Sequence, residues 1–210
     1  VLSAAQIDAL STTQIRALTT AQIGALTDAQ LDEFETDDIK ALTNAQISKM
    51  STSQIAGLSD TQLQAFTTAQ IPALTSSQIS NLAPAQLAAF TTDQLKALTA
   101  TQIKALTGDQ IDAIGTTDFA LLTSTQIAAL TTSQLDTFDA GQIAGLETSQ
   151  IKGLTVAQIK SLDATQIAAI ETEDLELFTA AQIAAFTTDQ VPVLSAAQID
   201  ALSTTQIRAL

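Results

Sequence analysis

Residues Leu18–Ala25 read Leu-Thr-Thr-Ala-Gln-Ile-Gly-Ala, and this eight-residue pattern decides the organisation of the chain. It runs from Leu2 to Ala209 as 26 consecutive octads without an insertion or a deletion. The consensus is Leu, Ser or Thr, any, any, Gln, Ile, any, Ala, and these places are termed positions one to eight. A short, fixed period of this kind is the signature of a repeat architecture.

Each octad carries the signals of a helix start. Position two is Ser or Thr in 19 octads, and position five is Gln in 23. Ser/Thr-x-x-Gln is a capping box, in which the hydroxyl accepts from the third helical amide while the Gln side chain accepts from the amide of the capping residue. Positions one and six are large and apolar throughout, which is the spacing of a hydrophobic staple. The pattern therefore predicts a new helix in every octad.

One long helix cannot contain these starts. Eight residues at 3.6 per turn rotate an apolar stripe by roughly 80° per octad, far more than the roughly 20° per heptad that supercoiling absorbs. The pattern predicts a string of helices of about one to one and a half turns, joined by abrupt corners. Pro84 falls at position three, the first helical residue, where its missing amide is harmless. Pro72 and Pro192 fall at position seven, which indicates a helix that is ending or tightening to 3₁₀.

A single octad cannot be stable alone. Burying two large side chains contributes roughly 3 to 6 kcal/mol, whereas ordering eight residues of backbone costs roughly 8 to 16 kcal/mol. Neighbouring turns must supply the difference, so we expect an all-α solenoid of very short helices, with position eight kept small where backbones approach. A Thr-rich solenoid of strands is the alternative, but Ala, Leu, Gln and Lys favour helix and only seven Gly occur.

The exceptions to Leu at position one indicate the size of a turn. Octads 5, 9, 12, 15, 18 and 22 carry Phe34, Phe66, Phe90, Ile114, Phe138 and Ile170 there. If these residues mark one side, 17 octads span five turns, which gives about 3.4 octads or about 27 residues per turn. Met50, Phe178 and Phe186 do not fit this spacing.

The composition limits the chemistry and the partners of the chain. With 210 residues it could form one or two ordinary domains, but the unbroken period predicts one continuous array over residues 1–210, cut from a longer chain. Cys, His, Trp and Tyr are absent, so we expect no enzyme activity, no catalytic or cofactor-binding residues and no cofactor. The formal charge of −14 argues against nucleic acid and anionic membranes as partners. No apolar run approaches the ~18 residues of a membrane-spanning helix.

Two acidic stretches are weak candidates for a calcium site. Three octads replace the position-five Gln with Asp38, Asp118 and Asp174, and further acids surround two of them. Asp37 and Asp38 in one stretch, and Glu173 and Asp174 in the other, offer the hard oxygen ligands that calcium prefers. Neither stretch has the spacing of a calcium-binding loop, so a solvated acidic surface is favoured over a metal site.

The two ends of the chain are identical in sequence. Residues 193–210 repeat residues 1–18 without a difference, at an offset of 192 residues or 24 octads. Chance does not explain this identity, because other octads differ at positions three, four and seven. Either the natural protein carries a tandem super-repeat of 24 octads, which is favoured, or the chain was engineered to close on itself.

Uninterrupted runs such as Leu18–Ala25 resemble the octapeptide tracts of large, repetitive, secreted bacterial surface proteins described as adhesins or haem-utilisation proteins. The resemblance extends over the whole chain. It implies an extracellular or cell-surface location. It implies no haem site here, because no His, Cys or Tyr is present to ligate iron and Met50 alone is a poor candidate.

These features favour a structural repeat rod, acting as an extracellular stalk, spacer or filament-forming segment. Self-association, either end to end or lateral, is the expected partnership, and neither membrane insertion nor a small-molecule ligand is expected. The alternative is a binding module for calcium, carbohydrate or protein that uses the variable, solvent-facing positions. A ligand-binding rod would gain melting temperature with its ligand, whereas a passive rod would not.

Overall fold

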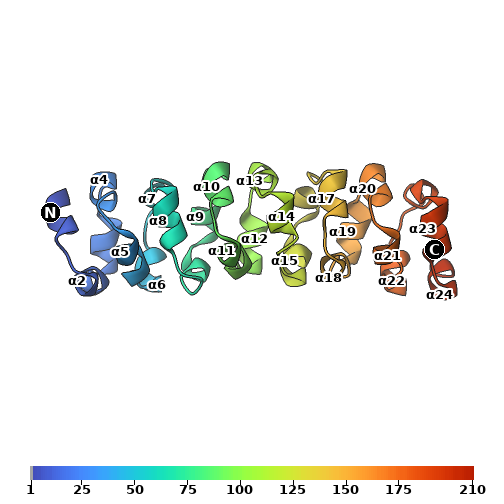
Figure 1. Ribbon diagram of the computed structural model, residues 1–210, viewed down its shortest axis with the longest axis horizontal. Helices are drawn as coiled ribbons and strands as arrows, with labels where there is room; N and C mark the ends of the chain where they lie inside the picture. Colours follow the sequence, from blue (N-terminus) through green and yellow to red (C-terminus); the bar gives the residue numbers. More distant parts are fainter. Residues whose placement is uncertain (1) are drawn as a thin grey trace. The chain divides into compact units, whose positions relative to one another are not determined.

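The computed structural model describes residues 2–210 and is all-helical over that range, which confirms the predicted fold class (Figure 1). No strand occurs among these residues, so the strand alternative is wrong. The chain divides into two compact units, one ending at Ala113 and the other spanning Ile114–Leu210. One continuous array over residues 1–210 stays a prediction. Within residues 2–210, no helix combines the length and the apolar character needed to cross a bilayer.

Every octad from Leu2 to Ala209 forms one short helix. In the first unit these are α1 (Ala4–Asp8), α2 (Thr12–Ala17), α3 (Thr20–Gly24), α4 (Asp28–Leu31), α5 (Thr36–Ala41), α6 (Asn44–Ile47), α7 (Thr52–Ala56), α8 (Asp60–Ala65), the 3₁₀ helix η1 (Ile71–Ala73), α9 (Ser76–Ser80), α10 (Pro84–Ala88), α11 (Thr92–Ala97), α12 (Ala100–Ala105) and α13 (Gly108–Ala113). In the second unit they are α14 (Thr116–Phe119), α15 (Ser124–Ala129), α16 (Thr132–Leu135), α17 (Ala140–Ala144), α18 (Thr148–Ile151), α19 (Val156–Ser161), α20 (Ala164–Ala168), α21 (Thr172–Leu175), α22 (Ala180–Ile183), the 3₁₀ helix η2 (Val191–Val193), α23 (Ala196–Ala201) and α24 (Thr204–Ile207).

The helices begin at position three because position two caps them. In α12 the amide of Thr99 donates to Oε1 of Gln102 at 2.8 Å, and the amide of Gln102 donates to the Thr99 hydroxyl at 3.3 Å. Asp139 caps α17 in the same way, accepting from the Gln142 amide at 2.7 Å. The backbone of the capping residue is extended, with φ −74° and ψ 158° at Thr99, so the chain turns a corner there. The predicted capping box is confirmed.

The three prolines stand where the sequence predicts that they are tolerated. Pro84 is the first residue of α10. Pro72 and Pro192 lie within η1 and η2, where positions six to eight form a 3₁₀ helix. A proline at position seven lacks the amide that a longer α-helix would need, and the short 3₁₀ turn does not require it.

The core consists of positions one and six. Ile103 at position six is completely buried, and Leu98 at position one is 3% exposed. The position-six ring of Phe119 packs edge to face against Phe138 at position one, with the ring centroids 4.9 Å apart. The spacing of a hydrophobic staple therefore also supplies the two apolar rows that pack in the interior.

Helices stack on helices three octads away within each unit. In the first unit α2 contacts α5, α5 contacts α8, and α10 contacts α13. In the second unit α15 contacts α18, and α16 contacts α19. Hydrogen bonds from the position-five glutamines to the preceding turn span 28 to 31 residues, as from Gln102 to Leu74 and Ile71. A turn therefore contains between three and four octads, in agreement with the predicted value of about 3.4.

The size of the residue at position eight is restricted only where two turns approach each other closely. A Cβ added to Gly153 would lie 2.9 Å from Cβ of Ser124, in the preceding turn, and 3.0 Å from the Ser124 carbonyl oxygen. Ala65 and Ala129 are buried at position eight. Many other position-eight residues, such as Ala25, are exposed. Small size there is thus a requirement of particular contacts between turns.

Replacing Thr99 by Ala is expected to lower the free energy of unfolding by about 1 kcal/mol, because the Gln102 amide loses its capping oxygen. Urea unfolding followed by circular dichroism measures the loss. The control is Lys104→Ala on the same helix, where the exposed side chain should change stability by less than about 0.5 kcal/mol. Equal losses at the two sites would contradict the capping role.

Candidate functional site

The most specific chemistry of the chain lies in the position-five glutamines, most of which are buried between turns. Gln78, Gln102 and Gln150 are 1%, 2% and 0% exposed. A primary amide has an acceptor oxygen and an NH₂ group that can donate twice, and a buried amide must satisfy both ends. The helix cap already engages Oε1, so Nε2 is left to bond elsewhere.

Nε2 donates to the end of a helix in the preceding turn. In Gln78 it lies 2.8 Å from the carbonyl oxygens of both Ile47 and Met50, which are 31 and 28 residues earlier. Ile47 is the last residue of α6, so these carbonyls belong to a helix end, where few partners exist within the helix. The glutamines that make both bonds are termed the glutamine ladder. They are Gln46, Gln54, Gln62, Gln70, Gln78, Gln94, Gln102, Gln110, Gln150, Gln158, Gln166, Gln190, Gln198 and Gln206.

The ladder joins the start of one helix to the end of another without burying a charge. Each side chain accepts from the amide of the position-two capping residue in its own octad and donates to carbonyls one turn earlier. A neutral amide makes both bonds with a small desolvation penalty, which a carboxylate would not. Among residues 2–210, every fully buried side-chain nitrogen and oxygen has a hydrogen-bond partner. The chemistry of this site is therefore hydrogen bonding between turns.

The capping-box pattern predicts only the acceptor half of the position-five Gln. A capping box accepts Glu as readily as Gln, yet Glu never stands at position five in the 26 octads. That exclusion is the signal for the second half, because Glu can cap but its ionised form has no hydrogen to donate.

Asp38, Asp118 and Asp174 stand at ladder positions but cannot replace the donor. The capping half survives at Asp38, whose Oδ2 accepts from the Glu35 amide at 3.1 Å. Burial raises the pKa of the Asp38 carboxyl, and repulsion from Asp37 and Asp8 acts in the same direction, whereas the Glu35 amide opposes it. Asp174 is 5% exposed. These octads therefore place a carboxylate where the ladder places an amide.

The calcium candidates form two pairs, Asp37 with Asp38 and Glu173 with Asp174, one in each unit. Asp37 is exposed and pairs with Lys40 at 2.9 Å. Glu173 is exposed, while its neighbour Asp174 is buried. In the part of the chain that the structure describes, no group of three or more acidic side chains is arranged to hold a metal ion. Calcium binding through Asp37, Asp38, Glu173 or Asp174 stays a prediction.

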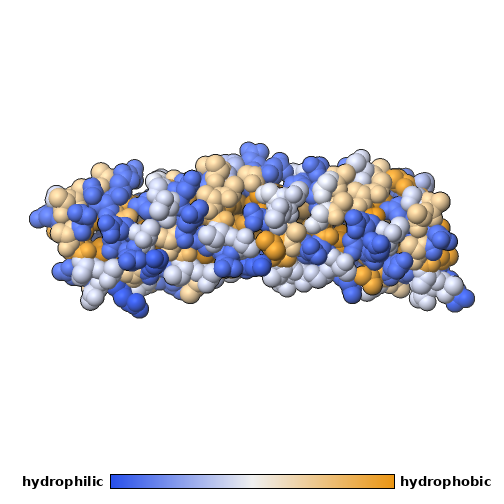
Figure 2. All heavy atoms as spheres, in the orientation of Figure 1, coloured by the Kyte–Doolittle hydropathy of each residue, from blue (hydrophilic) through white to orange (hydrophobic). Residues whose placement is uncertain are grey.

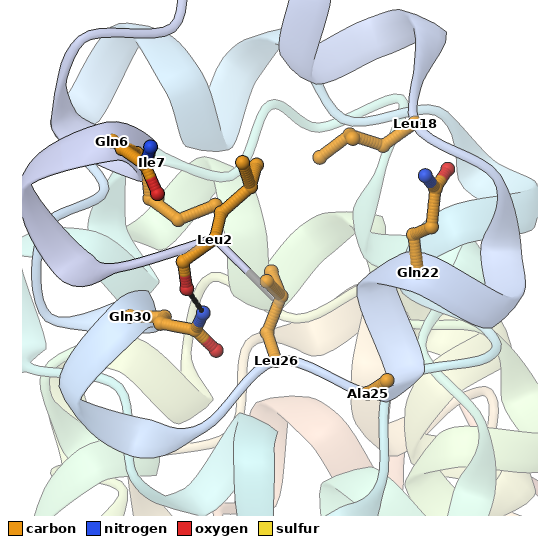
Figure 3. A pocket seen from close by; sticks show the side chains of 8 residues that line it. All are labelled: Leu2, Gln6, Ile7, Leu18, Gln22, Ala25, Leu26 and Gln30. Carbon is orange, nitrogen blue, oxygen red and sulfur yellow. Dashed lines mark hydrogen bonds between the residues drawn. The ribbon is translucent and has the colours of Figure 1, made fainter.

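A hollow of about 480 Å³ opens in the first turn of the chain (Figure 3). Its lining is Leu2, Gln6, Ile7, Leu18, Gln22, Ala25, Leu26 and Gln30. A second hollow of about 440 Å³ lies beside the first acidic stretch, and its lining includes Asp32 and Glu35 but neither Asp37 nor Asp38. Elsewhere polar and apolar side chains are intermixed over the face seen in Figure 2. Of the two hollows, the one in the first turn has the more apolar lining.

A family model described as the ALTTAQ repeat matches residues 1–33, 31–68, 80–116, 111–148 and 167–204. Together these segments cover well over half of the chain. The six residues named in that description, Ala-Leu-Thr-Thr-Ala-Gln, occur in this chain as residues 17–22, which run from position eight of one octad to position five of the next. No curated protein matches the chain in sequence.

Replacing Gln102 by Glu is expected to lower the free energy of unfolding by about 2 to 4 kcal/mol at neutral pH. The carboxylate would still accept from Thr99 but would face the Ile71 and Leu74 carbonyls without a proton. Its folded pKa would be raised, so the loss should shrink as the pH falls through that pKa and the protonated acid can donate. Urea unfolding at several pH values measures this.

The matched control is Gln14→Glu, which also changes a capping Gln but at an exposed position without a bond to another turn. We expect it to change stability by less than about 0.5 kcal/mol. If Gln102→Glu cost no more than Gln14→Glu, the bonds between turns would not stabilise the fold.

Replacing Asp38 by Gln is expected to raise the free energy of unfolding at neutral pH by about 1 to 2 kcal/mol, because the ladder can then extend to Ile7 and Leu10. The raised pKa of Asp38 means that its contribution to stability is fully present at acid pH and is lost as the pH rises through the folded pKa. The gain from Asp38→Gln should therefore diminish on acidification. Thermal unfolding across the acid range checks this, with Asp37→Asn as the control for removing an exposed charge. A gain independent of pH would rule out the titration of Asp38 as its cause.

Proposed function

Because the chain belongs to the ALTTAQ repeat family, we propose that it is a structural spacer, acting as an extracellular stalk or filament-forming segment. The observation that carries the proposal is the glutamine ladder. Within each unit its bonds tie a turn to the turn before, as Gln78 does to Ile47 and Met50 and Gln158 does to Ile127 and Leu130. The most specific side chains of the repeat are therefore used to hold successive turns together.

Nearest-neighbour packing supports a role in which length is the useful property. When each turn contacts only adjacent turns, stability is approximately a sum of equal local terms, and octads can be added without redesigning a core. The octad length is constant over all 26 copies, while positions three, four and seven vary. This combination is what a spacer needs, since its register is fixed while its surface is free to change.

The composition is compatible with the extracellular location that the proposal requires. The net charge of −14 favours solubility of a long repeated chain, because like charges oppose lateral aggregation. The fold relies on hydrogen bonds and apolar packing, and with no Cys in the sequence it needs no particular redox compartment. Haem binding forms no part of the proposal, because the chain has no His, Cys or Tyr.

Two measurements test the spacer. In the first, residues 19–210 are appended after Leu210, which continues the octad register through a second super-repeat. The maximum dimension from small-angle scattering should rise nearly in proportion to chain length, whereas folding back into a globule would raise it by only about a quarter. In the second, antibodies against the chain should label intact cells of the organism that encodes it. Labelling only after lysis would exclude the extracellular role.

A further inference from the structure

Asp174 is a buried carboxylate that the described chain leaves without a partner. It stands at position five of its octad, and its side chain is 5% exposed. Among residues 2–210, no hydrogen bond or ion pair engages this carboxylate. Asp38, by contrast, accepts from the Glu35 amide. Since a buried charge is normally paired or bound to a metal ion, the Asp174 carboxylate needs a partner from outside the chain.

The ladder keeps its register on both sides of Asp174. Gln166, one octad earlier, donates at 2.8 Å to the carbonyls 31 and 28 residues before it. Gln182, one octad later, donates at 2.9 Å to the carbonyl 28 residues before it. The same spacing places the carbonyls of Ile143 and Leu146, in the preceding turn of the same unit, opposite Asp174.

Both of these carbonyls lack the donor that the ladder supplies elsewhere. The Ile143 carbonyl accepts from the Leu146 amide at 3.2 Å. The Ile47 carbonyl accepts from the Met50 amide at the same distance, and its second lone pair accepts from Gln78. No side chain among residues 2–210 donates to Ile143 or Leu146. Two carbonyl oxygens and a carboxylate therefore face one another without a hydrogen-bond donor between them.

The gap between these oxygens has the width of a bound cation. Asp is one methylene shorter than Gln, so its oxygens stop about 1.3 Å short of the place that Nε2 would take. Ladder nitrogens lie 2.8 Å from their acceptors, as in Gln166, so the Asp174 carboxylate stops about 4 Å from the opposing carbonyl oxygens. A hydrogen bond cannot span that distance. An ion with bonds of about 2.4 Å to each oxygen can, and this is the range of calcium, whereas the bonds of magnesium, about 2.0 to 2.1 Å, would cross the gap only in a straight line.

The surrounding charges favour a cation. The octad of Asp174 contains four acids and no base. The two octads that carry the opposing carbonyls add Asp139, Glu147 and Lys152, of which Lys152 is exposed. On the other side α23, which contacts α21, adds Asp200 and no base. The negative potential of these acids raises the local concentration of cations around Asp174.

We propose that the Asp174 octad binds a calcium ion, which the Asp174 carboxylate and the carbonyls of Ile143 and Leu146 hold between two turns. The ion takes the place of the ladder NH₂ group and joins α21 to helix ends of the preceding turn. Every fully buried side-chain nitrogen and oxygen among residues 2–210 has a hydrogen-bond partner, so the unpartnered Asp174 oxygens keep some contact with solvent. Water can enter there and complete the shell of about six to eight ligands.

Affinity should be weak, because only one of the protein ligands carries a charge. A dissociation constant of about 10⁻⁴ to 10⁻³ M is typical of such calcium sites. Glu173, the other candidate ligand of this stretch, is exposed and has no part in the proposed site.

Thermal unfolding of the whole chain in about 0.1 M NaCl, with a chelator or with about 10 mM calcium chloride, tests this inference. Calcium should raise the melting temperature by about 3 to 7 °C. Asp174→Gln should bond Ile143 and Leu146 as the ladder does, so this variant should melt about 2 to 5 °C above the wild-type chain in chelator. Glu173→Gln is the matched control, because it removes an exposed acid from the same helix and should keep the calcium response.

Equilibrium dialysis with calcium counts the bound ions. Asp174→Gln should bind one calcium ion fewer per chain than the wild-type chain, and Glu173→Gln should bind the same number. A wild-type chain whose melting temperature does not respond to calcium would overturn the inference. So would an equal response to magnesium chloride, which would indicate screening of the acidic surface, or an Asp174→Gln variant that binds as many ions as the wild-type chain. None of these outcomes bears on the spacer role.

Discussion

Hydrogen bonds from buried glutamine amides to carbonyls of the preceding turn are the interaction on which the rest of the structure depends. A helix of four to six residues leaves nearly all of its backbone groups without partners inside the helix. A fold made of such helices must bond these groups elsewhere or expose them to water. Gln at position five meets both needs at once, because one end of its amide serves a helix start and the other serves helix ends in the turn before.

The ladder is more constant than the helices that it joins. In the octads with Pro72 and Pro192 the α-helix is replaced by a 3₁₀ turn, yet Gln70 and Gln190 still make both bonds to the preceding turn. The local backbone can therefore change while the contact between turns persists. What cannot vary is the spacing, because the bonds reach back 28 and 31 residues and an insertion would misalign both.

The aspartate octads show what the ladder excludes. Asp38 retains the capping bond to Glu35, but a carboxylate cannot donate to a carbonyl, and burial raises its pKa. The loss of the donor, rather than of the cap, is therefore what separates the Asp38 octad from the ladder octads.

The sequence by itself determined the octad register, the helix starts, the all-α class, the ending or tightening of the helices at Pro72 and Pro192, and a turn of between three and four octads. These follow from local signals, since a cap and an apolar period act within a few residues. Only the tertiary structure decided that Gln102 also bonds Ile71 and Leu74, that Asp37 pairs with Lys40, and which position-eight residues must stay small. The contacts of Gln102 and of position eight join residues of different turns, and an octad pattern that is the same everywhere cannot specify which turn meets which. The pairing of Asp37 with Lys40 depends on the rotamers of the two side chains, which the pattern does not specify either.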